Sequence, residues 1–204
     1  MGVETIAEMG EDINMNIPNV LTLLRISLIP ILVVIYYLPF SWSYLAAAII
    51  FGLAAITDWL DGFLARKLKQ VSSFGAFLDP VADKLIIAVA LVLLVQGYHT
   101  VFLAIPAAVI IGREIVISAL REWMAELGKR HTLAVSAMGK FKTAAQMVAI
   151  LLLLSQNPHD NSWITILGYI LIYVAAFFTL WSMTLYLLAA RDELLKKNVA
   201  LTPF

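Results

Sequence analysis

Apolar residues fill six long blocks of the chain, and polar residues gather in the short stretches between them. A membrane span needs about 20 mostly apolar residues to cross a hydrocarbon core of roughly 30 Å. Helices are expected because a segment in lipid must satisfy its own backbone amides. The predicted spans are Ile17–Leu38, Tyr44–Leu64, Phe77–Val95, Val101–Met124, Val135–Leu154 and Ile164–Ala189. The pattern therefore predicts an all-α integral membrane protein with six transmembrane helices.

Composition agrees with this prediction. Hydrophobic residues make up 62% of the 204 residues, charged residues only 14%, and the mean hydropathy is +0.90. These values lie well outside the range of ordinary soluble domains. The net charge of zero gives no basic field for nucleic acid. The absence of cysteine excludes disulfides and thiolate chemistry.

Charge in the connections predicts the orientation of the bundle. The loops "PFSW", "QGYHT" and "SQNPHDNS" contain no Lys or Arg. The basic residues that follow the second, fourth and sixth spans are Arg66, Lys67, Lys69, Lys129, Arg130, Arg191, Lys196 and Lys197. By the positive-inside rule both termini are therefore expected in the cytoplasm.

One domain is expected over residues 15–190. Residues 1–14 are acidic and lack the pattern of a signal peptide, so they are expected to be a disordered or cloning-derived extension. Residues 191–204 are expected to form a cytoplasmic tail.

Four aspartates meet at the predicted cytoplasmic face. Asp58 and Asp61 end the second span with i,i+3 spacing, and Asp79 and Asp83 begin the third with i,i+4 spacing. Each pair shares one face of its helix, so two neighbouring helices can aim four carboxylates at a common point. Carboxylates are costly in a membrane, and like charges a few Å apart oppose one another's ionisation.

Divalent cations would resolve both problems. Hard oxygen ligands suit Mg²⁺, Mn²⁺ or Ca²⁺, and two ions can share four carboxylates while they clamp a phosphate. The alternative is that the aspartates cap helix ends and pair with neighbouring cations. Those cations are Arg66, Lys67 and Lys84.

Small residues and one arginine separate the two acidic pairs. Gly62, Ala65 and Gly75 leave room for a phosphate beside the helix backbone, although small residues in membrane helices also serve packing. Arg66 offers a guanidinium suited to bidentate phosphate binding.

The spacing of these residues fits D-x2-D-G-x2-A-R-x8-G-x3-D-x3-D at every fixed position. The residues concerned are Asp58, Asp61, Gly62, Ala65, Arg66, Gly75, Asp79 and Asp83. On this pattern the chain resembles the CDP-alcohol phosphotransferase family. The resemblance extends over nearly the whole chain from Met15, since members of that family also have six spans with cytoplasmic termini.

The resemblance implies an enzyme in which an alcohol displaces CMP from a CDP-linked lipid such as CDP-diacylglycerol. It assigns Asp58, Asp61 and Asp79 to two divalent cations, Mg²⁺ or Mn²⁺. It makes Asp83 the general base with a share in metal binding. It places the cytidine and diphosphate beside Asp58, Gly62, Ala65, Arg66 and Gly75. It further implies a homodimer, in a bacterial inner membrane, with the site at the cytoplasmic face.

Four further cations predict the acceptor. They are Arg113 and Arg121 on the fourth span, and Lys140 and Lys142 at the start of the fifth. Together they favour an acceptor that carries its own phosphate, such as glycerol 3-phosphate, because a neutral acceptor such as serine needs less positive charge. Two alternatives remain open: an ion pair between Arg113 and Glu114, and snorkelling of the two lysines to the membrane surface.

The stretch "NIPNVLTLLR" places Asn19, Thr22 and Arg25 at three-residue spacing, a polar edge on an apolar helix. It resembles the short juxtamembrane helix of the family, which lies along the membrane surface and covers the nucleotide. Asn19 is the candidate ligand here, although capping and anchoring explain these residues equally well.

Other functions remain as alternatives. An inositol phosphate or serine acceptor would keep the same metal chemistry. A membrane prenyltransferase is a further alternative, but such enzymes carry their two aspartate motifs far apart in the chain, unlike the two neighbouring pairs here. A cation transporter needs polar residues across the bilayer, whereas most spans here have no acidic residue in their outer halves.

Overall fold

Six helices form the described part of the computed structural model. It describes the backbone of residues 17–68, 73–126, 137–160 and 162–200, and the side chains of residues 19–58, 78–126, 142–160 and 162–188. The helices are α2 (Ile17–Tyr36), α3 (Ser43–Leu68), α4 (Ser73–Tyr98), α5 (Val101–Glu126), α6 (Ala137–Leu154) and α7 (Trp163–Ala200). No strand occurs among these residues.

Each predicted span overlaps one helix, so the all-helical fold class is confirmed for the described residues. The largest difference in length is in α7, which continues to Ala200, beyond the predicted end of the last span at Ala189. Three helical stretches are long and apolar enough to cross a membrane: Asn19–Tyr36, Val101–Glu126 and Trp163–Leu188. The apolar stretches Ser43–Asp58 and Lys142–Leu154 are shorter. The structure thus supports a membrane protein, and the count of six crossings stays a prediction.

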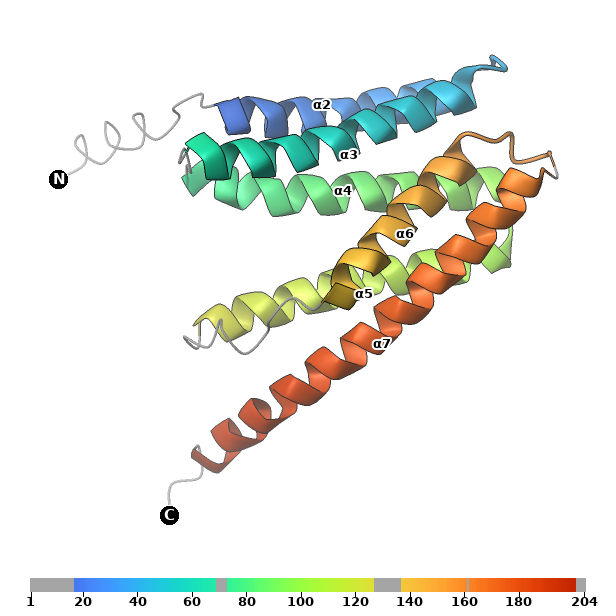
Figure 1. Cartoon of the computed structure of the whole chain (residues 1–204). Helices are drawn as coiled ribbons and strands as arrows, with labels where there is room; N and C mark the ends of the chain where they lie inside the picture. Colours follow the sequence, from blue (N-terminus) through green and yellow to red (C-terminus); the bar gives the residue numbers. More distant parts are fainter. Residues whose placement is uncertain (1–16, 69–72, 127–136, 161, 201–204) are drawn as a thin grey trace.

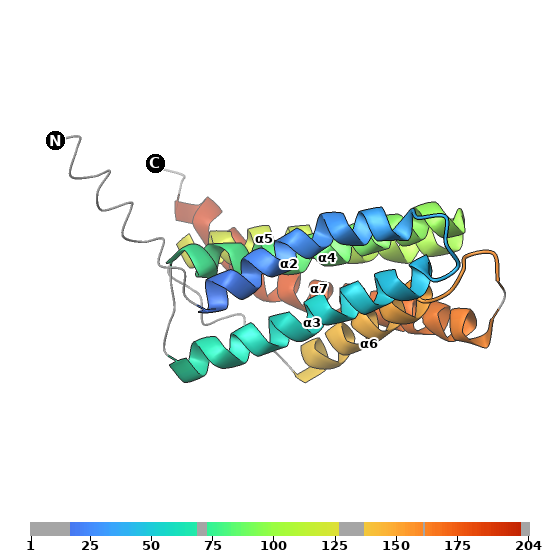
Figure 2. The ribbon, with the colours of Figure 1, turned by 90° about the horizontal axis from the view of Figure 1, so that it is seen from above.

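The helices run up and down along one common direction. The connections after α2, α4 and α6 lie together at one end of the bundle, and α3, α5 and α7 return toward the other end, where α2 and α4 begin (Figures 1 and 2). The most extensive packing is between α6 and α7 and between α2 and α3. This topology brings the end of α3 and the start of α4 to the same end of the molecule.

Helix α2 is longer than the short juxtamembrane helix that its first residues resemble. The stretch "NIPNVLTLLR", residues 16–25, resembles a short juxtamembrane helix, but residues 17–25 are continuous with the rest of α2 up to Tyr36, as the predicted span Ile17–Leu38 implies. Pro18 stands at the start of α2, where its missing amide costs no hydrogen bond, and no glycine or proline interrupts residues 19–29. Asn19, Thr22 and Arg25 therefore project from a long helix inside the bundle.

Apolar side chains from all six helices fill the centre of the bundle. The largest fully buried ones include Phe51, Leu91, Leu103 and Ile150. Gly168 allows α7 to approach α6, because a Cβ there would lie only 2.7 Å from Cγ of Leu153.

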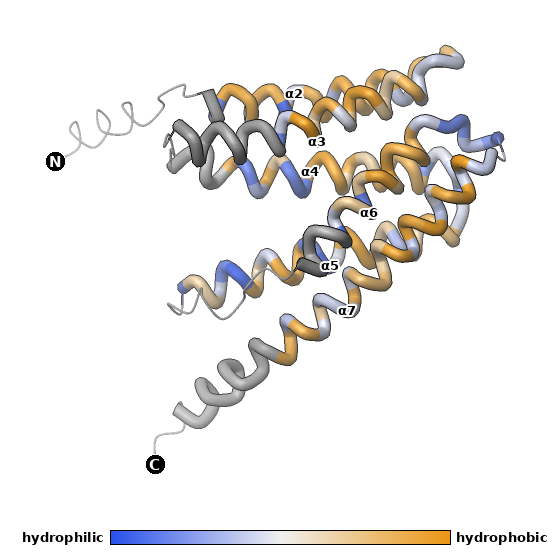
Figure 3. Tube along the Cα trace, in the orientation of Figure 1, coloured by the Kyte–Doolittle hydropathy of each residue, from blue (hydrophilic) through white to orange (hydrophobic). Residues whose placement is uncertain are grey.

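Hydrophobic residues predominate along the middle of the helices, as the hydropathy colouring shows (Figure 3), and many of their side chains are exposed. Large side chains such as Ile56, Phe102 and Phe177 are more than half exposed. At the end opposite the aspartates, Phe40 stacks on Trp42 with the ring centroids 5.5 Å apart. Amphipathic aromatics such as Trp42 are typical of the interface between lipid and water.

Candidate active site

Three of the four predicted aspartates fall among the described side chains. Asp58 lies near the end of α3, and Asp79 and Asp83 lie one turn apart near the start of α4. The expected meeting of the two helices is realised for Asp58 and Asp83, because both carboxylates contact the same nitrogen atom. That nitrogen belongs to neither helix.

It is Nη1 of Arg25, which projects from α2 between α3 and α4. The Nη1 atom lies 3.2 Å from Oδ1 of Asp58 and also contacts Oδ1 of Asp83. The side chain of Arg25 is fully buried, whereas those of Asp58 and Asp83 are about 40% exposed. Each carboxylate therefore contacts a buried cation and is itself partly exposed.

The remaining polar residues of α2 continue this contact. The hydroxyl of Thr22, one turn before Arg25, donates to Oδ1 of Asp79. Asn19, a further turn away, is also buried. The three-residue spacing thus turns one edge of α2 toward the carboxylates.

Arg25 is the site residue that the sequence reasoning missed. The polar edge of α2 was recognised, but only Asn19 was selected from it. The sequence did contain a signal for Arg25, which is a single arginine inside an apolar helix. A charge buried in a membrane protein is costly and is usually paired, so such an arginine indicates a nearby carboxylate.

A small cavity adjoins Arg25, Asp58 and Asp83. Its other walls are apolar or small and come from α3, α4 and α6: Phe51, Ala54, Ala55, Ile86 and Met147. The cavity is therefore bounded by two carboxylates and a guanidinium on one side and by apolar side chains on the others.

Several predicted residues cannot be placed. The side chains of Asp61, Gly62, Ala65, Arg66, Gly75 and Lys140 lie outside the described residues. Their assigned roles stay predictions.

The donor chemistry of the described residues fits a divalent cation in part. Carboxylate oxygens are the ligands that Mg²⁺ and Mn²⁺ prefer. Asp58 and Asp83 both contact Nη1 of Arg25, and each side chain is about 40% exposed, so a ligand can still approach them. Within the described residues, however, no three Asp, Glu, His or Cys side chains gather closely enough to hold a metal by themselves. The role of Asp61 as a further ligand stays a prediction, because its side chain lies outside the described residues.

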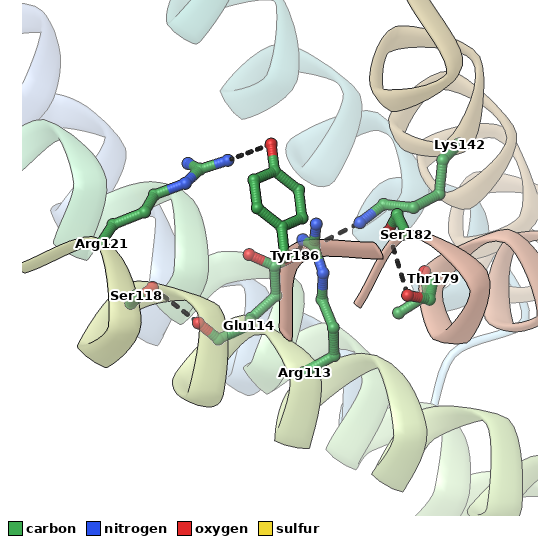
Figure 4. A network of polar contacts seen from close by, with 8 residues as sticks. All are labelled: Arg113, Glu114, Ser118, Arg121, Lys142, Thr179, Ser182 and Tyr186. Atoms are coloured by element: carbon green, nitrogen blue, oxygen red, sulfur yellow. Dashed lines mark hydrogen bonds and ion pairs between the residues drawn. The ribbon is translucent and has the colours of Figure 1, made fainter. Parts of the chain in front are cut away.

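A second polar group lies between α5, α6 and α7 (Figure 4). Arg113 of α5 contacts Oε1 of its neighbour Glu114, and Nζ of Lys142 from α6 lies 3.6 Å from the same oxygen. Both cations are buried, with 10% of the Arg113 side chain and 4% of the Lys142 side chain exposed. The ion pair considered from the sequence is present, and Lys142 joins it.

Arg121 stands two turns further along α5 and is exposed. Its Nη2 donates to the hydroxyl of Tyr186 from α7 at 3.4 Å, and its guanidinium carbon lies 5.6 Å from the centre of the Tyr186 ring. The group formed by Arg113, Glu114, Arg121 and Lys142 therefore holds three cations and one carboxylate. This balance leaves positive charge for an anionic ligand.

Helix α6 connects the two polar groups. Met147 lines the cavity beside Asp58 and Asp83, and Lys142 lies five residues earlier on the same helix. Five residues correspond to about 7.5 Å along a helix axis. The two polar groups therefore border α6 at positions less than two turns apart.

Comparison with known proteins assigns this arrangement to a class. The model of the CDP-alcohol phosphatidyltransferase family matches residues 15–181, so the chain belongs to this family. The resemblance based on the eight-residue pattern is thereby confirmed.

Individual relatives are similar over nearly their whole length. Three of them come from Salmonella choleraesuis (strain SC-B67), Shigella flexneri serotype 5b (strain 8401) and Escherichia coli (strain K12). Each is named CDP-diacylglycerol--glycerol-3-phosphate 3-phosphatidyltransferase. Each is 58% identical to this chain over 180 residues, which is 88% of this chain and 97% of the relative.

Proposed function

We propose that this protein transfers the phosphatidyl group of CDP-diacylglycerol to sn-glycerol 3-phosphate and releases CMP. The observation that carries the proposal is the 58% identity, over 97% of their length, to relatives named for this reaction. The product, phosphatidylglycerophosphate, belongs to the synthesis of phosphatidylglycerol and cardiolipin. Membership of the family favours a transferase over the cation transporter considered from the sequence.

In this proposal Asp58, Asp61, Asp79 and Asp83 hold two divalent cations, Mg²⁺ or Mn²⁺. Bound cations would neutralise charge on the diphosphate and on the leaving CMP. The partial exposure of Asp58 and Asp83 supports this role, because a ligand can reach both carboxylates.

Asp83 is proposed as the general base. A free hydroxyl of glycerol 3-phosphate attacks the phosphorus that carries the diacylglycerol, the bond from that phosphorus to the oxygen of CMP breaks, and the hydroxyl proton passes to Asp83. A base must come within about 3 Å of the hydroxyl that it deprotonates. Arg25 supports the assignment because it keeps this carboxylate oriented without covering its exposed side.

The CDP-lipid is proposed to lie along the acidic helices, beside Asn19, Asp58, Gly62, Ala65, Arg66 and Gly75. Asn19 is buried at the start of α2, on the edge that faces the carboxylates. This position supports a role in the polar part of the CDP-lipid site.

The phosphate of the acceptor is proposed to bind Arg113, Arg121, Lys140 and Lys142. The surplus of cations over carboxylates in the described group supports an anionic acceptor. Glu114 contacts both Arg113 and Lys142, and one carboxylate balances only one of these two positive charges. The remaining positive charge favours an acceptor with at least one negative charge over neutral serine.

The membrane arrangement completes the proposal. We place six helices across a bacterial inner membrane with both termini and the aspartates at the cytoplasmic face, and we expect a homodimer. The exposed apolar side chains along α2, α5 and α7 support burial in lipid.

The test is release of CMP by the purified protein in detergent with CDP-diacylglycerol and Mg²⁺. Glycerol 3-phosphate, inositol phosphate, serine and no acceptor are compared. Turnover with glycerol 3-phosphate alone is expected. It should stop when EDTA is added and return with excess Mg²⁺ or Mn²⁺.

Other results separate the parts of the proposal. Preference for inositol phosphate would keep the metal chemistry and reassign the acceptor. Full activity in EDTA would contradict the divalent cations. Ion flux in liposomes that lack CDP-lipid would instead favour the transporter.

A further inference from the structure

Helix α7 carries a buried hydroxyl with no hydrogen-bond partner. Thr179 is fully buried, and its Oγ1 makes no hydrogen bond with any described residue. Buried polar atoms are nearly always paired, so an unpaired one in a native structure requires a reason.

The neighbouring hydroxyls of α7 show that pairing was available. Ser182 donates to the carbonyl oxygen of Thr179 at 3.0 Å, and Thr184 donates to the carbonyl oxygen of Leu180 at 3.0 Å. Such bonds to the preceding turn are usual for Ser and Thr in helices. Thr179 departs from this behaviour, and its hydroxyl stays available to donate.

The register of α5 and α7 places Thr179 at the level of Arg113. The two helices pack against each other and run in the same direction (Figure 1). Arg121 meets Tyr186 between them. Arg113 lies eight residues before Arg121, and Thr179 lies seven residues before Tyr186. Both steps are close to two turns of helix.

The register of α6 and α7 gives the same level independently. These helices are antiparallel (Figure 1) and meet where Gly168 packs on Leu153. Lys142 lies eleven residues before Leu153, and Thr179 lies eleven residues after Gly168. Thr179 thus stands opposite Lys142, within the polar group drawn in Figure 4.

A second unpaired donor lies at this level. Nε of Arg113 is buried and makes no hydrogen bond among the described residues. Two unused donors and an ammonium group at the same level are complementary to an anion with several acceptor oxygens.

We infer that Thr179 is a further ligand of the acceptor's phosphate and donates its hydroxyl to one phosphate oxygen between Arg113 and Lys142. This inference rests on the proposed function, because it refines the acceptor site. It adds α7 to a site that the sequence assigned only to the fourth and fifth spans.

The test compares Thr179→Val, which keeps the shape and removes the hydroxyl, with Thr184→Val on the same helix. Thr184 is exposed and already bonded to its own helix, so its variant should behave as the wild type. Thr179→Val should raise the KM for glycerol 3-phosphate about tenfold or more, because a hydrogen bond to a charged group is lost. The KM for CDP-diacylglycerol should stay unchanged. Thr179→Ser should restore most of the affinity.

A binding measurement accompanies the kinetics. Glycerol 3-phosphate should raise the midpoint of thermal unfolding of the wild type more than that of Thr179→Val. The wild type could bind glycerol 3-phosphate without turning it over, while Thr179→Val does not bind it. That result would reject the proposed reaction and keep the inference about Thr179. An unchanged KM and an unchanged ligand shift in Thr179→Val would overturn the inference. If the valine variant does not fold, Thr179→Ala and Thr179→Ser give the same comparison.

Discussion

The buried guanidinium of Arg25 lies 3.2 Å from the carboxylate of Asp58. The same nitrogen reaches Asp83, so one cation from α2 holds carboxylates from two other helices. Aspartates this close repel each other unless a positive charge lies between them. Arg25 supplies that charge from inside the protein, since its side chain is fully buried.

Replacement of Arg25 should therefore weaken the fold and the site together. Removing one partner of a fully buried ion pair costs roughly 3–5 kcal/mol. The exposed carboxylates lower this cost, so we expect Arg25→Met to lose about 1–3 kcal/mol of unfolding free energy. Thermal unfolding in detergent measures the loss.

Divalent cations should compensate for the missing guanidinium. Mn²⁺ is expected to raise the midpoint of unfolding of Arg25→Met more than that of the wild type, since the variant's carboxylates lack their internal cation. Arg25→Lys, which keeps the charge, should fall between the two. Equal stability of all three proteins without metal would contradict the role of Arg25.

Asp83→Asn tests the general base. The change keeps the size of the side chain and leaves Arg25 paired with Asp58. General bases contribute about 10²- to 10⁴-fold to rate, so CMP release should fall by that factor while the protein stays folded. Asp160→Asn is the matched control, because Asp160 is exposed in the loop at the other end of the bundle. Near-normal turnover of Asp83→Asn would refute the assignment.

Arg113 and Lys142 should affect the acceptor and not the CDP-lipid. For Arg113→Ala and Lys142→Ala we expect an increase of about tenfold or more in the KM for glycerol 3-phosphate, from the loss of charge-assisted hydrogen bonds. Arg121→Ala should have a smaller effect, because Arg121 is exposed and its guanidinium also contacts Tyr186. Steady-state kinetics with each substrate varied in turn separates the two constants. The reverse pattern would assign these cations to the nucleotide.

Gly97 tests the packing at the opposite end of the bundle. A Cβ at this position would lie 2.0 Å from the hydroxyl oxygen of Tyr36. Tyr36 is buried, so it cannot move away freely, and overpacking of this kind typically costs about 1–3 kcal/mol. Gly97→Ala should lower the midpoint of thermal unfolding accordingly.

Two variants control this prediction. Gly112→Ala should be neutral or stabilising, because nothing lies within 4 Å of its added Cβ and alanine favours helix. Tyr36→Phe removes a hydroxyl that makes no hydrogen bond among the described residues. It should therefore restore part of the stability lost in Gly97→Ala, and an additive double variant would show that the two side chains do not clash.

The sequence by itself determined the helical architecture and the chemistry of the acidic pairs. Long apolar blocks admit only helices in lipid, so each block could be assigned without knowledge of its neighbours. Helical spacing placed Asp79 and Asp83 on one face, and the eight-residue pattern identified the family. These properties are local, because they depend on residues close together in the chain.

Only the tertiary structure decided which polar groups face one another. The distances from Arg25 to Asp58 and Asp83, and from Lys142 to Glu114, depend on how separate helices pack and rotate about their axes. No sequence spacing reports that rotation, and a polar edge on α2 is therefore equally compatible with the membrane surface and with the interior. The same holds for Thr179, whose unpaired hydroxyl becomes visible only when α5, α6 and α7 are brought together.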